Sequence, residues 1–149
     1  MARIYLDVCC LQRPFDDPRQ ARVHFEAEAV KLILAQVEAG ELTWIASEIV
    51  DYEIAQNPDP ERAFRAMLLA AYAKVRVTIG SNETARASEL ERLGFTGFDA
   101  LHLACAESGG ADAFLTTDDK LLKRAVRLAD KLRVHVANPL EWLREDLTV

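Results

Sequence analysis

Four acidic side chains lie at positions where carboxylates could be gathered into one site. Asp7 ends the apolar segment RIYL, and Asp118 follows the apolar segment AFLTT. Glu53 lies one helical turn beyond Ile49, on the expected inward face of its helix, and Asp99 opens the apolar stretch FDALHLACA. Neighbouring carboxylates repel each other, and proteins accept that cost mainly where the acids share a cation. Oxygen ligands suit Mg²⁺ or Mn²⁺, and an ion held by them can prepare a water for attack on a phosphodiester.

Each of these acids also has a purely structural interpretation. Asp118 or its neighbour Asp119 could cap a helix, and Asp99 suits the positive end of a helix dipole. For any single acid this interpretation is the more frequent one. The prediction of a metal site therefore depends on four acids that each follow a strand or open an apolar helix, whereas Glu48 and Asp51 are expected to be solvated.

The acids can meet only if the fold brings their segments together, and the alternation of elements predicts such a fold. Five short apolar stretches are typical of strands, at residues 2–7, 42–46, 74–79, 112–117 and 133–137. Helical patterns occupy residues 23–40, 48–56, 59–73, 82–94, 98–108, 119–132 and 139–146. This alternation predicts an α/β sandwich around a parallel sheet. In such sheets the ligand site lies at the carboxyl ends of the strands, near the point where strand order reverses.

Length and composition restrict the class of protein. With 149 residues, half of them hydrophobic, the chain is expected to form one domain, residues 1–149, with a sizeable core. The net charge of −6 argues against a general nucleic-acid binder, although a local basic patch could still hold RNA. There is no signal-peptide core, and no apolar run approaches the roughly 20 residues of a membrane span, so we expect a soluble cytoplasmic protein. The three cysteines lack CxxC spacing, which argues against a structural zinc site or a disulfide framework.

Over essentially the whole chain, these segments resemble the PIN domains. RIYLDVCCL is similar to the first motif of that family, with Asp7 as its acid, and IASEIVDYEI to the second, with Glu53. GFDALHLACA, the most specific stretch, is similar to the third motif, with Asp99. FLTTDDKLL is similar to the fourth, with Asp118 as the acid and Thr116 as its hydroxyl partner. The resemblance implies a three-layer fold with strand order 3-2-1-4-5 and a ribonuclease in which the four acids hold Mg²⁺ or Mn²⁺ and are the catalytic residues.

The resemblance also implies partners, and it exposes one departure from the family pattern. Many PIN domains are toxins of bacterial type II toxin–antitoxin pairs, which implies an RNA substrate, a protein antitoxin and a homodimer. The family usually carries Thr, Ser or Asn just after the first acid, whereas Val8, Cys9 and Cys10 stand there in this chain. The two thiols could bind a softer metal or oxidise beside the ion, or they could pack as small buried residues.

Two further side chains are expected to assist the acids. Asp119 doubles the fourth acid, so either member of the pair could face the metal. The spacing from Thr116 favours Asp118 as the ligand, which leaves Asp119 to cap the helix or to assist from behind the ligand. His102 lies one turn after Asp99 and could orient a ligand or act as a general acid, or it could be a hydrogen-bonded core histidine.

A basic stripe follows the fourth acid directly. Lys120, Lys123, Arg124 and Arg127 recur at intervals of three and four, which predicts one basic face of a helix. Such a face, with Arg13 from the loop after the first strand, could hold a phosphate backbone beside the metal. The alternative is an ordinary solvated face.

Two functions from other classes compete with the ribonuclease. One is a PIN-like module that binds RNA or protein without cutting, an alternative that the residues after Asp7 keep open. The other is a phosphoacceptor domain of the receiver type, which would need paired acids near the first strand and a lysine after the last. The first strand offers only Asp7 and the fifth is followed by ANPLEW, so this hypothesis ranks last.

Overall fold

A five-stranded parallel sheet forms the centre of the computed structural model, which describes residues 1–148, with side chains through Glu145. The strands are β1 (Ala2–Leu6), β2 (Leu42–Ser47), β3 (Val75–Val77), β4 (Ala113–Leu115) and β5 (His135–Ala137). They pair in the order β3-β2-β1-β4-β5. The expected strand order is therefore confirmed, and β1 and β4, which lead to the first and fourth acids, are neighbours.

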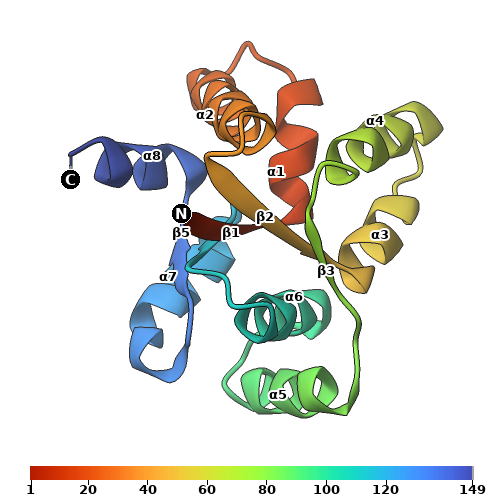
Figure 1. Cartoon of the computed structure of the whole chain (residues 1–149), viewed down its shortest axis with the longest axis vertical. Helices are drawn as coiled ribbons and strands as arrows, with labels where there is room; N and C mark the ends of the chain where they lie inside the picture. Colours follow the sequence, from red (N-terminus) through yellow and green to blue (C-terminus); the bar gives the residue numbers. More distant parts are fainter. Residues whose placement is uncertain (149) are drawn as a thin grey trace.

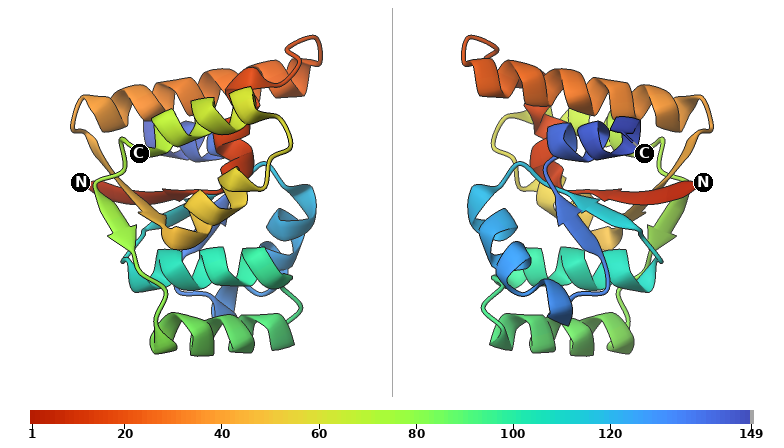
Figure 2. Two further views of the ribbon diagram at one scale, coloured as in Figure 1. Left: turned by 90° about the vertical axis from the view of Figure 1, so that its right-hand side faces the viewer. Right: turned by 90° about the vertical axis from the view of Figure 1, so that its left-hand side faces the viewer.

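Helices cover both faces of the sheet (Figure 1, Figure 2). One face carries α1 (Val8–Gln12), α2 (Ala21–Glu38), α4 (Pro60–Ala70) and α8 (Pro139–Thr148). The other face carries α6 (Gly97–Ser108), with α5 (Ser81–Arg92) packed on its outer side. Two helices lie at the margins: α3 (Glu48–Ala55) contacts both α4 and α6, and α7 (Asp119–Arg127) packs against β5. This arrangement confirms the predicted three-layer α/β sandwich.

The two central strands are held in register by large buried side chains. Tyr5 and Leu6 of β1 pair with Phe114 and Leu115 of β4, and all four side chains are fully buried. The rings of Tyr5 and Phe114 stack with their centroids 5.3 Å apart. The register continues past the strand, since the backbone N–H of Asp7 donates to the carbonyl of Leu115 at 2.9 Å. Residues just beyond the two strands therefore emerge side by side.

α6 is an apolar helix because the sheet and α5 enclose it. Its buried side chains are Ala100, His102, Leu103, Ala104, Cys105 and Ala106. The helix ends at Gly109, where a Cβ would come within 2.7 Å of Ile45 Cγ2 in β2. A side chain at this position would clash with β2, so glycine allows the end of α6 to lie close to the sheet.

Several element boundaries differ from those expected. A short helix, α1, and a 3-10 turn (Arg13–Phe15) occupy the segment expected to be a loop. The last three strands are three residues long each, and the helix expected over residues 119–132 ends at Arg127, before a 3-10 turn (Ala129–Lys131). α1 forms because Asp7 accepts a capping bond from Val8 N and the helix buries apolar side chains, a tertiary effect that sequence periodicity does not register. Within residues 1–148, no helix has the length and apolar character needed to cross a membrane.

Candidate metal-dependent active site

Asp7 is the most deeply placed of the predicted acids. It lies at the carboxyl end of β1 and its residue is only 6% exposed. One carboxylate oxygen, Oδ1, accepts from Val8 N at 2.9 Å, and the other, Oδ2, accepts from the hydroxyl of Thr116 at 2.8 Å. Burial raises the pKa of Asp7, and the charge of Glu53 raises it further, against the opposing influence of His102 and Thr116. The hydroxyl partner expected for the site is thus in contact with the first acid.

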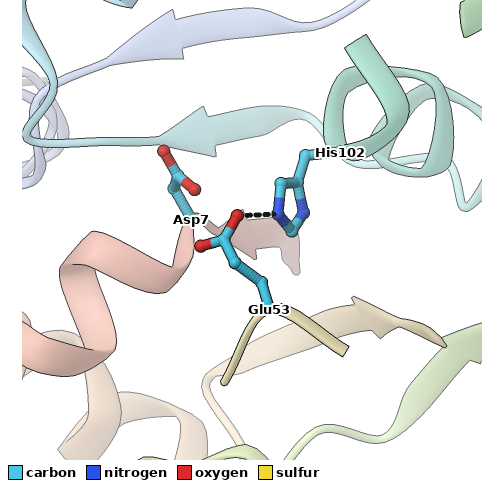
Figure 3. Close-up of side chains that lie close together, drawn as sticks. All are labelled: Asp7, Glu53 and His102. Carbon is cyan, nitrogen blue, oxygen red and sulfur yellow. Dashed lines mark hydrogen bonds and ion pairs between the residues drawn. The ribbon is translucent and has the colours of Figure 1, made fainter. Parts of the chain in front are cut away.

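Glu53 and His102 approach Asp7 from two different helices (Figure 3). One oxygen atom of each carboxylate and one ring nitrogen of His102 all lie within 4.8 Å of one another. His102 Nε2 and Glu53 Oε1 form a hydrogen bond of 3.1 Å. His102 is completely buried, and its Nδ1 lies 2.7 Å from the hydroxyl of Tyr5. His102 is therefore a hydrogen-bonded core histidine that also orients one of the acids.

A fourth residue extends this buried chain. The Tyr5 hydroxyl lies 2.7 Å from Ser47 Oγ, so Ser47, Tyr5, His102 and Glu53 are linked in a row. Ser47 occupies the N-cap position of α3, but its side chain makes no capping bond. Its hydroxyl bonds to Tyr5 instead, which sequence reasoning missed because the two residues are 42 positions apart.

Asp99 joins the same site from the first turn of α6. Its Oδ2 accepts a hydrogen bond from the hydroxyl of Thr96 at 3.2 Å. Burial raises the pKa of Asp99 to about 6, and the charges of Asp7 and Asp118 contribute further. This mutual influence means that Asp99 lies close enough to Asp7 and Asp118 for their charges to interact across the end of the sheet.

Asp118 and Asp119 have separate partners. Asp118 caps α7, with Oδ1 accepting from Lys120 N at 3.0 Å and Leu121 N at 3.3 Å, which leaves Oδ2 available. Asp119 receives two hydrogen bonds from the Arg22 guanidinium, at 2.6 and 2.8 Å, and this cation lowers the pKa of Asp119. The expectation that Asp119 caps the helix is therefore wrong. Its side chain turns toward α2, whereas Asp118 lies on the side of Asp99.

A basic cleft opens beside these acids. It has a volume of about 320 Å³, and its lining includes Thr96, Asp99, Asp118, Lys120, Lys123, Arg124 and Arg127. α7 buries Leu121 and Ala125 against the rest of the domain. Arg13, which was expected to join this surface, does not line the cleft. Its guanidinium pairs with Glu26 at 3.0 Å and with Asp16 at 3.1 Å, under α2.

Comparisons with known proteins agree with this geometry. A family model described as PIN domain matches residues 4–128. The chain belongs to the PIN-domain family. A search of curated proteins found no match.

Solved structures share the fold of this PIN domain at low sequence identity. VapBC-1 from nontypeable Haemophilus influenzae is 16% identical, with a TM-score of 0.58 over 92% of this chain and 98% of that chain. FitAcB from Neisseria gonorrhoeae is 16% identical, with a TM-score of 0.57 over 91% and 97%. VapBC2 from Rickettsia felis, bound to a DNA fragment from its promoter, is 13% identical, with a TM-score of 0.55 over 91% and 98%. At these identities the similarity concerns the fold alone.

Cys9 is one of the three residues after Asp7, in the segment that departs from the family pattern. Its Sγ lies 3.5 Å from Asp7 Oδ2 and 3.3 Å from Thr116 Oγ1, and it accepts from Thr117 N at 3.3 Å. Cys10 instead points into the core, where its thiol donates to the carbonyl of Leu115 and burial raises its pKa well above the usual value. Each of the two alternatives for these cysteines therefore applies to one of them. The Cys9 thiol borders the site, and the Cys10 thiol packs beneath it as a small buried residue.

The side chains present fit a hard divalent cation. The potential ligands are carboxylate oxygens, which suit Mg²⁺ and Mn²⁺. The pKa of Asp7 is raised by burial and by the charge of Glu53, and that of Asp99 by burial and by the charges of Asp7 and Asp118. A shared cation would relieve this repulsion. His102 is engaged at both ring nitrogens by Tyr5 and Glu53, so it fits the role of a support better than that of a ligand.

Proposed function

We propose that this PIN domain is a metal-dependent endoribonuclease in which Asp7, Glu53, Asp99 and Asp118 hold Mg²⁺ or Mn²⁺. The observation that supports the proposal best is the approach of Asp7, Glu53 and His102 to within 4.8 Å of one another. Asp99 adds to it, since burial and the charges of Asp7 and Asp118 raise its pKa, and the pKa of Asp7 is raised as well. A purely structural role would not require these charges to be brought together, because each would be more stable in water.

In this proposal the protein fixes the acids before substrate arrives. Thr116 and Val8 N hold the two oxygens of Asp7, and His102 holds Glu53. The cap on α7 fixes Asp118. When bound, the ion would supply an activated water and would stabilise the oxygen that leaves the phosphodiester. Pre-positioned ligands favour catalysis because little reorganisation remains to be done during the reaction.

The cleft beside the acids would hold the substrate backbone. Lys120, Lys123 and Arg127 bring positive charge to the wall of the cleft. RNA phosphates bound along this wall would place the neighbouring phosphodiester close to Asp99 and Asp118. These cations give the cleft local positive charge although the net charge of the chain is negative. Arg13 would not take part directly, since its guanidinium is held by Glu26 and Asp16.

We further propose that the chain is the toxin of a toxin–antitoxin pair and forms a homodimer. The family membership and the FitAcB and VapBC structures that share its fold support an antitoxin partner. The α4 region also carries exposed apolar side chains of a kind that protein partners cover, namely Phe64, Met67, Leu68 and Tyr72.

The test is cleavage of single-stranded RNA with Mn²⁺ or Mg²⁺, compared with EDTA, in the wild type, Asp7→Asn and Asp130→Asn. Asp130 is an exposed acid outside the site and serves as the matched control. We expect metal-dependent cleavage that Asp7→Asn abolishes and Asp130→Asn retains. Cleavage that persists in Asp7→Asn or in EDTA would contradict the proposal.

The second candidate is a PIN module that binds RNA or protein without cutting. The thiol of Cys9 beside Asp7 favours it, because a thiol is a weaker hydrogen-bond partner for metal-bound water than a hydroxyl or an amide. RNA binding with no cleavage in any metal would support this candidate. The receiver-type hypothesis is set aside because the chain belongs to the PIN-domain family.

A further inference from the structure

Two exposed aromatic side chains stand on the two helices that supply Glu53 and Asp99. Tyr52 of α3 is 56% exposed and Phe98 of α6 is 40% exposed. Their rings form an edge-to-face pair, with centroids 5.8 Å apart and an interplanar angle of 75°. Each directly precedes a proposed metal ligand in the sequence, Tyr52 before Glu53 and Phe98 before Asp99. The pair therefore bridges the two helices that supply these acids.

The exposure of the pair is not explained by the fold. α3 and α6 bury other apolar side chains against the core, such as Ile49, Ile54 and Leu103, while Tyr52 and Phe98 face solvent. In an edge-to-face pair, the ring that presents its edge keeps both of its own faces uncovered by its partner. Aromatic surface of this kind is suited to stacking against a flat apolar ligand.

We propose that Tyr52 and Phe98 stack an unpaired nucleobase of the RNA substrate next to the scissile phosphate. This inference rests on the ribonuclease function proposed above. Asp99 lines the basic cleft, and Phe98, the residue before it on α6, lies against Tyr52. An RNA strand whose phosphates contact the cations of α7 would bring one of its bases to the rings of Tyr52 and Phe98. A paired duplex cannot do so, because its bases are stacked inside the helix.

The surroundings of the pair favour a nucleic acid over a protein. The exposed apolar side chains of the α4 region, including Phe64 and Tyr72, form a broader hydrophobic surface without the proposed ligands among them. Tyr52 and Phe98, in contrast, directly precede Glu53 and Asp99 in the sequence, and Asp99 lines the cationic cleft that could hold a phosphate chain.

The experiment measures stacking directly, in EDTA, where the proposed cleavage cannot occur. A short single-stranded RNA carries 2-aminopurine at successive positions, and its fluorescence is followed as protein is added. We expect quenching at one position with the wild type, and its loss in Tyr52→Ala and Phe98→Ala. Affinity should fall roughly tenfold to a hundredfold in these variants. Tyr52→Trp should retain quenching, whereas Tyr52→Leu, which is apolar but lacks a ring, should not.

Tyr72→Ala and Phe64→Ala are matched controls, because these rings are exposed to a similar degree but lie in or just after α4. Both should quench as the wild type does. Equal quenching, affinity and cleavage in Tyr52→Ala, Phe98→Ala and the wild type would overturn the stacking proposal and leave the ribonuclease proposal intact. A change in oligomeric state in Tyr52→Ala with unchanged RNA binding would identify the pair as a protein contact and also overturn it. If the wild type fails to cut RNA with any metal, the ribonuclease proposal is contradicted instead. The quenching would still show whether a base stacks on Tyr52 and Phe98.

Discussion

His102 of α6 and Glu53 of α3 meet in a hydrogen bond of 3.1 Å between Nε2 and Oε1. An ionised Glu53 can only accept, so Nε2 of His102 carries the proton. In a neutral imidazole Nδ1 is then an acceptor, and the hydroxyl of Tyr5 must donate to it. Burial raises the pKa of Tyr5 well above its usual value, which keeps this hydroxyl protonated. Ser47 completes the chain by donating to Tyr5, so each hydrogen bond fixes the direction of the next.

This chain of hydrogen bonds predicts that Tyr5 controls metal affinity without contacting the metal. Tyr5→Phe keeps the ring stacked on Phe114 but removes the donor to His102, so the imidazole and Glu53 lose their fixed orientation. We expect Mn²⁺ affinity, measured by calorimetry, to fall about 10- to 100-fold. The free energy of unfolding should drop by about 1–3 kcal/mol, because Ser47 and His102 lose a buried partner. Tyr72→Phe, on the surface just after α4, should change neither quantity, and wild-type metal affinity in Tyr5→Phe would refute the role assigned to the chain.

Sequence patterns predicted the layers of this fold because alternating strands and helices are local signals. The four acids could be selected for the same reason, since each stands beside a strand or on an apolar helix. The interactions that depend on distant parts of the chain could not be predicted. The hydroxyl of Ser47 bonds to Tyr5 rather than capping α3, and α1 exists because its apolar side chains are buried by other elements. The exposure of Tyr52 likewise depends on how α3 meets α6.

The stability of the metal-free protein should fall as pH rises from about 4 to about 6. The pKa of Asp99 is raised to about 6 and that of Asp7 is also raised, both mainly by burial. A carboxyl with a raised pKa keeps its proton in the folded state where the unfolded chain has lost it. Its stabilising contribution is therefore present at low pH and is lost as pH rises through the folded pKa. Thermal unfolding in EDTA across this range should show a falling Tm.

Two comparisons isolate the source of that pH dependence. Asp99→Asn should flatten the decline, while Asp130→Asn, an exposed acid elsewhere, should leave it unchanged. With saturating Mn²⁺ the trend should reverse, because the ion competes with protons for the same carboxylates and binds better at higher pH. A Tm in EDTA that is flat or rises between pH 4 and 6 would contradict the repulsion inferred for the site.

The basic wall of the cleft should be visible in the salt dependence of RNA binding. If Lys123 and Arg127 bind phosphates, the double variant Lys123→Ala, Arg127→Ala should bind more weakly at low salt. The slope of log affinity against log salt should also fall by roughly one unit for each phosphate that is no longer neutralised. Lys31→Ala, on α2 and away from the cleft, is the control and should keep the wild-type slope. An unchanged slope in the double variant would leave these cations as a solvated helix face.

Cys9 should make the site receptive to soft metals. Its Sγ is 3.5 Å from Asp7 Oδ2, so an ion bound to that carboxylate is within reach of the thiol. Titration with Cd²⁺ should produce thiolate-to-cadmium absorption in the ultraviolet for the wild type and not for Cys9→Thr. Cys105→Ala should behave as the wild type, because Cys105 is a fully buried residue of α6. Cys9→Thr, which replaces the thiol by a hydroxyl, should preserve or increase Mg²⁺-dependent cleavage. Cd²⁺ absorption that survives in this variant would show that the Cys9 thiol is not involved.

Replacing Asp118 by asparagine should abolish cleavage, whereas replacing Asp119 by asparagine should not. Asp118→Asn keeps a capping oxygen for Lys120 N but lacks the charge needed beside Asp99, so cleavage should be abolished while the Tm changes little. Asp118→Ala should lose cleavage as well and, by losing the cap, about 1 kcal/mol of unfolding free energy. Asp119→Asn weakens only the exposed pair with Arg22 and should retain most activity. Equal loss of cleavage in the two asparagine variants would mean that both acids serve the ion, and loss in Asp119→Asn alone would reverse the assignment.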